Sequence, residues 1–210
     1  RIFGYTQEDL KTIISPMIIN GKEAIGSMGT DTPLAVLSEK PQLLFNYFKQ
    51  LFAQVTNPPL DGIREEIVTD ISLTLGKEFN LFDVSPKHAK KLFIENPIIS
   101  NEDLDKISSL KKNHFKASKV SILYEVDMGF NGLEISLNDI VSKIEIEISN
   151  GSNIIILSDR GVSPTLAPIP ILLATSHVHN YFKRHKKRSS FGIILESAEP
   201  REPHHFALLF

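Results

Sequence analysis

Polar side chains that could do chemistry follow two short apolar runs in the last third of the chain. The runs are Ile154–Leu157 and Phe191–Leu195, and each is typical of a buried strand. Acids, arginines and histidines near such strand ends could bind an anionic substrate or transfer protons. They could instead pair with one another and hold loops against a neighbouring domain, and this second reading is favoured because no nucleophile lies nearby. The polar set after the two runs is Asp159, Arg160, Glu196, Arg201, His204 and His205.

The histidines do not have the spacing of a metal site. His177 and His179 are two residues apart, so on a helix they point to different faces. His204 and His205 are adjacent, and the chain has no HExxH motif. We therefore expect no metal ligand and assign no catalytic residue.

A run of basic residues, Lys183–Arg188, has two readings. It could form a patch that binds phosphate or nucleic acid. It also falls at the end of an expected helix, where cations stabilise the helix dipole. The second reading is favoured because no aromatic residues are interleaved with the charges. We expect a solvated helix end and no nucleic-acid partner.

A glycine-rich loop near the N-terminal end must bend sharply and lie close to a ligand, a domain or the core. It contains neither GxxxxGK[ST] nor GxGxxG, so it carries no phosphate-binding motif. Its residues are Gly26, Ser27, Met28, Gly29, Thr30 and Asp31.

Composition indicates an ordinary globular protein. The chain has 210 residues, of which 41% are hydrophobic and 23% charged, and a formal net charge of −2. No apolar run approaches the roughly 20 residues that span a membrane. The absence of cysteine excludes thiolate metal sites and a cysteine nucleophile within these residues. The same absence leads us to expect a cytoplasmic protein. Arg1 at the start and the apolar Phe206–Phe210 at the end lead us to expect an excised piece of a longer protein.

The C-terminal half predicts alternating strands and helices. A strand is expected at Val120–Val126 and a helix at Ser136–Ser149, where apolar residues recur on one face. The Ile154–Leu157 strand follows, then a helix from about Ala167 to His185, and the Phe191–Leu195 strand. This β-α-β-α-β order predicts an α/β fold with a parallel sheet and right-handed crossovers.

The N-terminal half is less regular. Capping patterns predict helices after Thr6, Ser85 and Ser100. An aromatic-rich helix is expected within Leu43–Phe52, between segments that contain several Gly and Pro residues.

Blocks of sequence from one end of the chain to the other resemble the central domain of glutamate synthases. The resemblance rests on Gly26-Ser27-Met28-Gly29 with Asp31–Ser38, on the run Tyr47–Pro59, on Leu157–Val162 and on Glu196–Ala207. These blocks occur in a fixed order and are more specific than any single motif above. The whole of residues 1–210 is therefore expected to be one central, connecting domain.

The resemblance implies a function for the parent protein. Glutamate synthases make two glutamates from glutamine and 2-oxoglutarate with electrons from NAD(P)H or ferredoxin, and so serve nitrogen assimilation. The family places an amidotransferase domain before the central domain and an FMN-binding domain with an iron–sulfur cluster after it. A reductase subunit or ferredoxin would supply the electrons. The implied fold of the central domain is a rudimentary or partial TIM barrel, and it would hold no cofactor itself.

The resemblance also implies that the loop Gly26–Asp31 contributes to a tunnel that carries ammonia between the two active sites. Small residues and backbone would leave room for ammonia without a group that protonates it. Two alternatives remain open from the residues alone. One is an independent barrel-like enzyme that acts on an anionic small molecule, and the other is a binding module that uses Lys183–Arg188.

Overall fold

A computed structural model describes residues 2–24, 31–55, 57–110 and 114–210. The chain forms two compact units. The terminal unit contains Arg1–Pro59 together with Ala198–Phe210, and the sheet unit contains Leu60–Ser197. The terminal unit is therefore built from two segments that are far apart in the sequence.

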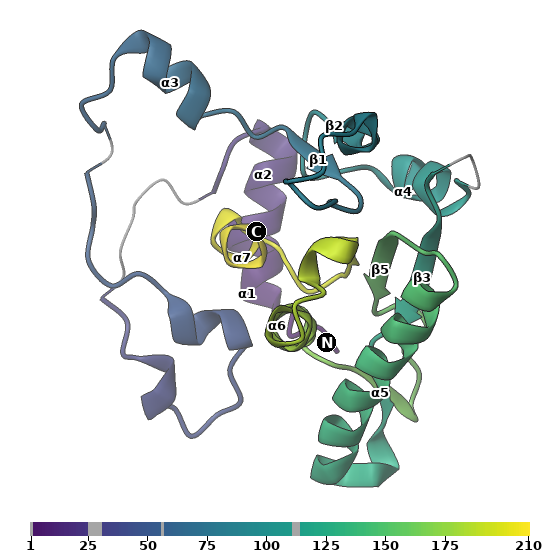
Figure 1. Ribbon diagram of the computed structural model, residues 1–210. Helices are drawn as coiled ribbons and strands as arrows, with labels where there is room; N and C mark the ends of the chain where they lie inside the picture. Colours follow the sequence, from purple (N-terminus) through teal and green to yellow (C-terminus); the bar gives the residue numbers. More distant parts are fainter. Residues whose placement is uncertain (1, 25–30, 56, 111–113) are drawn as a thin grey trace. The chain divides into compact units, whose positions relative to one another are not determined.

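The terminal unit begins with the predicted capping box. The Thr6 hydroxyl accepts the Asp9 N–H, and the Asp9 carboxylate accepts the Thr6 N–H, which satisfies two otherwise free donors at the helix start. The helix then runs on as one rod (Figure 1) and ends at Gly21, whose φ of 59° is readily adopted by glycine. The elements of this unit are α1 (Gln7–Asp9), the π-helical η1 (Leu10–Ile14), α2 (Ser15–Asn20), the 3₁₀ turns η2 (Ala35–Leu37) and η3 (Leu44–Phe48), and α7 (Pro203–Leu209).

The aromatic helix expected within Leu43–Phe52 is wrong in type and length. The segment forms only the 3₁₀ turn η3, in which Phe45 alone is buried. Tyr47, Phe48 and Phe52 are exposed, so no continuous apolar face supports further helical turns.

The sheet unit holds the α/β part of the chain. Its elements are α3 (Gly62–Val68), β1 (Leu73–Leu75), η4 (Pro86–Ala89), β2 (Leu92–Ile94), α4 (Asn101–Ser108), β3 (Ala117–Ser121), β4 (Leu123–Glu125), η5 (Val126–Met128), α5 (Gly129–Ser149), β5 (Ile154–Ser158), β6 (Leu166–Pro168), α6 (Ile171–Arg184), η6 (Arg188–Ser190) and β7 (Gly192–Glu196).

The predicted parallel sheet is confirmed. Strands β3, β5 and β7 lie in that order and pair in parallel, with α5 between the first two along the chain and α6 between the last two. Their register places Ser121, Ser158 and Glu196 side by side at the carboxyl ends. Strand β5 is central and buried along its whole length, as its run of apolar residues predicts.

Both faces of this sheet are covered. Ile154 and Ile156 of β5 pack in one cluster with Leu75 of β1 and with Leu104 and Ile107 of α4. Strand alternation points Ile155 and Leu157 to the opposite face, and both are fully buried. Helix α5 contacts β3, β4 and α6. The core on one face of the sheet is thus formed by Leu75, Leu104, Ile107, Ile154 and Ile156.

Helix α5 confirms the predicted apolar face and corrects its start. Leu137, Ile140, Val141 and Ile144 are buried, and Gly151 with φ 90° follows the helix end. The helix begins at Gly129 rather than at Ser136, because the turn η5 leads directly into it.

Two other boundaries differ from prediction. The strand expected at Val120–Val126 is two strands in different sheets, because the backbone of Ile122 bonds to Ser158 on one side and to Ile169 on the other. The helix expected from Ala167 starts at Ile171, because Ala167 pairs with Tyr124 in the antiparallel β4–β6 ladder.

The described residues contain no closed barrel, so a TIM-barrel architecture is not confirmed. The parallel sheet has three strands, and the other two sheets are antiparallel pairs. Over the same residues, no helix is both long and apolar enough to cross a membrane.

Candidate functional site

The carboxyl ends of the parallel strands hold an ion-pair network centred on Glu196, which we call the strand-end cluster. Glu196 is the last residue of β7, and its side chain is only 9% exposed. Its Oε2 accepts the Ser158 hydroxyl at 2.6 Å and lies 3.0 Å from the ammonium of Lys119. Its Oε1 accepts the Nε–H of Arg160. The cluster, defined as Lys119, Ser158, Arg160 and Glu196, thus joins all three strands.

Arg160 and Asp159 lie in the turn that follows β5. The Arg160 backbone N–H donates to the Ser158 hydroxyl at 3.2 Å, and the Asp159 N–H donates to the Glu196 carbonyl at 3.1 Å. The Arg160 guanidinium also reaches the side-chain oxygen of Asn101, the first residue of α4, at 3.5 Å. The turn is therefore fixed to both β7 and α4.

The cluster keeps Glu196 ionised. Burial raises the pKa of Glu196, but hydrogen bonds from Ser158, Arg160 and Lys119 together outweigh it and lower the pKa to about 2. Glu196 in turn raises the pKa of Arg160. A carboxylate with so low a pKa is a weak base and is not a proton donor near neutral pH. The geometry therefore favours a network that holds strand ends over acid–base catalysis.

The other half of the predicted polar set belongs to the terminal unit. The Arg201 side chain is 1% exposed, and its guanidinium donates to the carbonyls of Phe3 at 2.8 Å and Gly4 at 3.2 Å. It also pairs with Asp9 at 3.1 Å and stacks over the Tyr5 ring at 4.1 Å. Arg201 thus ties the C-terminal segment of this unit to its N-terminal segment.

His205 completes this arrangement, which we call the Arg201 cluster (Phe3, Gly4, Tyr5, Asp9, Arg201 and His205). His205 stacks on Phe45 with ring centroids 4.3 Å apart, and its Nδ1 accepts the Arg201 N–H. Its Nε2 lies 3.0 Å from the Glu202 carboxylate, and this contact lowers the pKa of Glu202. His204 lies 3.2 Å from the Phe45 carbonyl. Each histidine is used in packing.

Sequence reasoning identified Arg160 and Glu196, which the structure brings together, but missed Lys119. That lysine lies inside β3, which was expected to begin only at Val120, so its position near the Glu196 carboxylate was hidden. Of the glycine-rich loop, Gly26, Ser27, Met28, Gly29 and Thr30 lie outside the described residues, and Asp31 is exposed. In the described part of the chain, no group of three or more His, Asp or Glu side chains could hold a metal ion.

The fold and its two clusters are those of an α/β domain in which polar residues hold strand ends and distant chain segments together. The family model of the glutamate synthase central domain matches residues 1–210. The chain belongs to that family.

Large glutamate synthase chains contain similar sequences. The chain is 44% identical over 209 residues to the NADPH glutamate synthase large chain of Bacillus subtilis, covering 100% of this chain and 13% of that one. It is 40% identical over 211 residues to ferredoxin-dependent glutamate synthase 2 of Synechocystis, covering 99% of this chain and 13% of that one. It is 36% identical over 209 residues to the NADH glutamate synthase of Schizosaccharomyces pombe, covering 99% of this chain and 10% of that one. The chain therefore spans a small part of the length of these relatives.

Proposed function

We propose that these residues work as the connecting domain of a glutamate synthase, which forms two glutamates from glutamine, 2-oxoglutarate and reducing equivalents. The observation that carries the proposal is the match to the central-domain family over residues 1–210. In the relatives, the matching region makes up only 10–13% of the whole chain. On this proposal the two compact units act as one domain between an amidotransferase domain and an FMN-binding domain. The electron donor would be NAD(P)H, through a reductase, or ferredoxin.

The residues fit a domain that leaves redox chemistry to its neighbours. The chain has no cysteine, so it offers no thiolate to an iron–sulfur cluster. Glu196, a buried glutamate of the sheet unit, is ionised and held by Lys119 and Arg160. FMN and the cluster would accordingly lie in the flanking part of the parent enzyme.

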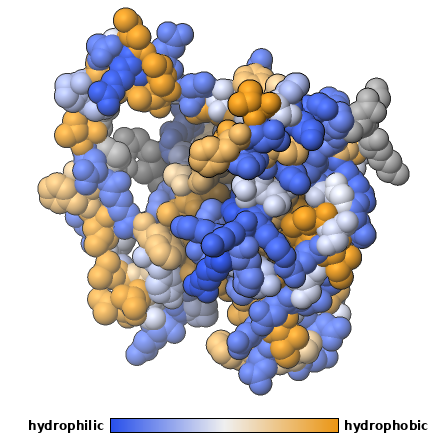
Figure 2. Space-filling model, viewed as in Figure 1, coloured by the Kyte–Doolittle hydropathy of each residue, from blue (hydrophilic) through white to orange (hydrophobic). Residues whose placement is uncertain are grey.

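Residues 34–55 expose many apolar side chains, which supports the view that flanking domains cover this part of the terminal unit. Figure 2 shows hydrophobic atoms at the surface along this part of the terminal unit, on the left of the view. Apolar groups grouped in this way commonly mark contact surfaces. The exposed apolar side chains of this segment are Leu34, Val36, Leu37, Tyr47, Phe48, Leu51, Phe52 and Val55, each at least 47% exposed.

This contact surface can be tested by placing charges on it. Phe52 is 80% and Val55 is 76% exposed, so Phe52→Lys and Val55→Lys should leave the unfolding temperature of the 210-residue chain nearly unchanged. In the full-length enzyme the same changes should lower that temperature and speed proteolysis between domains, because a buried lysine lacks a partner. If the substitutions change the unfolding temperature equally in the 210-residue chain and in the full-length enzyme, flanking domains do not cover this segment.

We further propose that the loop Gly26–Asp31 forms part of an ammonia tunnel. Its small side chains, Gly26, Ser27, Gly29 and Thr30, leave space and offer no amine or imidazole to trap a proton. In the full-length enzyme, Gly29→Phe or Thr30→Phe should raise the glutamine hydrolysed per 2-oxoglutarate consumed. Asn20→Phe, at an exposed helix end, is the matched control. An unchanged ratio in both loop variants would refute the tunnel role.

A further inference from the structure

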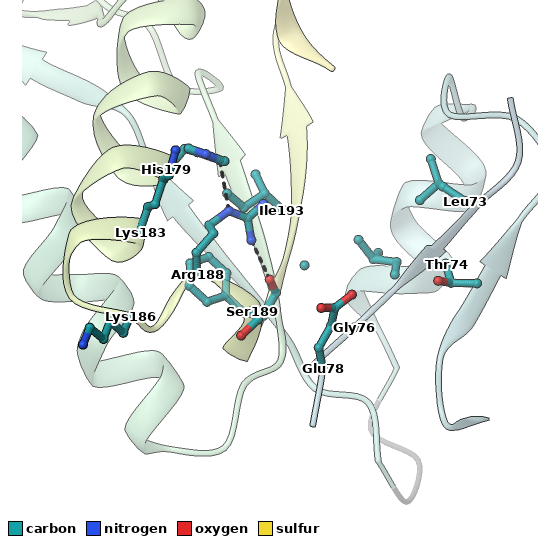
Figure 3. Close-up of a pocket in the computed structure, with 13 residues that line it drawn as sticks. Leu73, Thr74, Gly76, Glu78, His179, Lys183, Lys186, Arg188, Ser189 and Ile193 are labelled. Carbon is teal, nitrogen blue, oxygen red and sulfur yellow. Dashed lines mark hydrogen bonds between the residues drawn. The ribbon is translucent and has the colours of Figure 1, made fainter. Parts of the chain in front are cut away.

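The sheet unit contains a cavity of about 610 Å³ beside the basic run that was expected to be a solvated helix end. Its volume lies within the range of roughly 300–1,000 Å³ that is typical of small-molecule sites. Strand β1, the end of α6 and the start of β7 form its walls (Figure 3). We call it the basic cavity, because four of its lining residues, His179, Lys183, Lys186 and Arg188, are basic.

Arg188 is the most enclosed of these groups, and its guanidinium is only partly used. Its Nε–H donates to His179 Nδ1 at 3.3 Å and one terminal nitrogen donates to the Phe191 carbonyl at 2.8 Å, as the dashed lines in Figure 3 mark. The group also lies 5.3 Å above the centre of the Phe191 ring. These contacts use two of the five N–H groups of an arginine. The two hydrogen bonds orient the guanidinium of Arg188 and leave its remaining N–H groups for another acceptor.

Arg188 has no carboxylate partner among the residues that the structure describes. The one acid that lines the basic cavity, Glu78, is 3.0 Å from Lys91 and is paired there. Burial lowers the pKa of Arg188, and the charge of Glu78 opposes this only in part. A partly buried cation without a counter-ion is costly, and an anion in the cavity would offset that cost.

The neighbouring groups indicate a positive potential in the same place. Burial lowers the pKa of His179, and the charges of Arg188 and Lys183 lower it further. His179 is therefore held neutral and accepts from Arg188, while the exposed Lys183 supplies a second positive charge. Thr74 and Ser189 also line the cavity.

We propose that the basic cavity binds a small molecule that carries a phosphate or carboxylate group. The oxyanion accepts from the N–H groups of Arg188 that are not engaged by His179 and Phe191, and it is drawn in by Lys183. Arginine presents a planar fork to such anions, and the fixed orientation of Arg188 makes that recognition specific. The apolar side chains of Leu73 and Ile193 contact the remainder of the molecule.

The test measures binding of inorganic phosphate and, separately, succinate to the full-length chain that carries this domain, by titration calorimetry at one ionic strength. Arg188→Gln should weaken saturable binding of at least one probe about tenfold or more, the loss expected for a charge-assisted hydrogen bond. Arg184→Gln is the matched control, because it removes the same charge at the end of α6, four residues before Arg188 in the chain, and Arg184 does not line the cavity. It should change affinity less than about twofold, because exposed charges act weakly.

The outcomes separate specific binding from general attraction. Binding of phosphate alone identifies a phosphate-bearing ligand, and binding of both probes identifies any compact oxyanion. If Arg188→Gln does not fold, Lys183→Gln serves instead, since Lys183 is exposed, and it should weaken binding about threefold. The proposal is overturned if Arg184→Gln weakens binding as much as Arg188→Gln does. It is also overturned if neither probe shows binding that depends on Arg188 or Lys183.

Discussion

Replacing Glu196 by glutamine tests whether charge, rather than shape, makes the strand-end cluster stabilising. The folded-state pKa of about 2 lies below the ordinary value of 4.5. A depressed pKa adds stability that is complete above about pH 4.5 and is lost as the pH falls towards about 2. That difference corresponds to about 3 kcal/mol, an upper limit because Lys119 and Arg160 are partly exposed and water screens them. We expect Glu196→Gln to cost about 2–3 kcal/mol at neutral pH.

The assay is urea unfolding of the 210-residue chain, followed by far-UV circular dichroism at several pH values. The cost of Glu196→Gln should shrink towards zero as the pH approaches about 2, because the wild-type carboxyl then becomes neutral like the amide. Glu125→Gln, at an exposed position of the same unit, should cost less than about 0.5 kcal/mol throughout. A cost that is the same at neutral and acidic pH would show that packing rather than charge holds the strand ends, and would refute the reasoning.

Three further substitutions probe the rest of the fold. Arg201→Ala should cost about 3–5 kcal/mol, because Asp9 and two backbone carbonyls lose their buried donor. Hydrogen exchange should rise in the terminal unit first, and an equal rise in the sheet unit would contradict this. Gly192→Ala would place a methyl 2.4 Å from the Leu75 Cδ1 and should cost about 1–3 kcal/mol in urea unfolding. Combined with Leu75→Ala it should cost less than the sum of the two, and simple additivity would contradict the clash. Lys186→Gly should raise the unfolding free energy by about 1 kcal/mol, because Lys186 has a φ of 58°. An unchanged or lower unfolding temperature would contradict that strain.

The fold of the sheet unit was predictable where burial is one-sided or complete. The apolar face of α5 and the uninterrupted apolar run of β5 have periods that only a helix or a buried strand satisfies. The split between β3 and β4 was not predictable, because it depends on Ile122 bonding to two different strands. A linear pattern does not record which partner a strand residue takes, so the switch of sheet at Ile122 left no local signal.

The candidate site was predictable to the extent that strand topology determines it. Arg160 follows β5 and Glu196 ends the neighbouring parallel strand β7, and the carboxyl ends of such strands must meet at one edge. The partners of Arg201 were hidden, because Asp9 and the carbonyl of Phe3 are almost the whole chain away. The cavity beside Arg188 was also hidden, since one of its walls is made by residues of β1 that no motif links to the basic run.

The two-segment terminal unit has a consequence for synthesis of the chain. The Tyr5 hydroxyl donates to the Ala198 carbonyl across 193 residues, and Arg201 reaches Phe3 across 198. A ribosome releases the N-terminal segment long before these partners exist, while the sheet unit has all its own strands by Ser197. The sheet unit can therefore fold first and bring the segments on either side of it closer, which reduces the entropy lost when they meet. The first residues of the terminal unit to emerge would then be among the last to reach their native contacts.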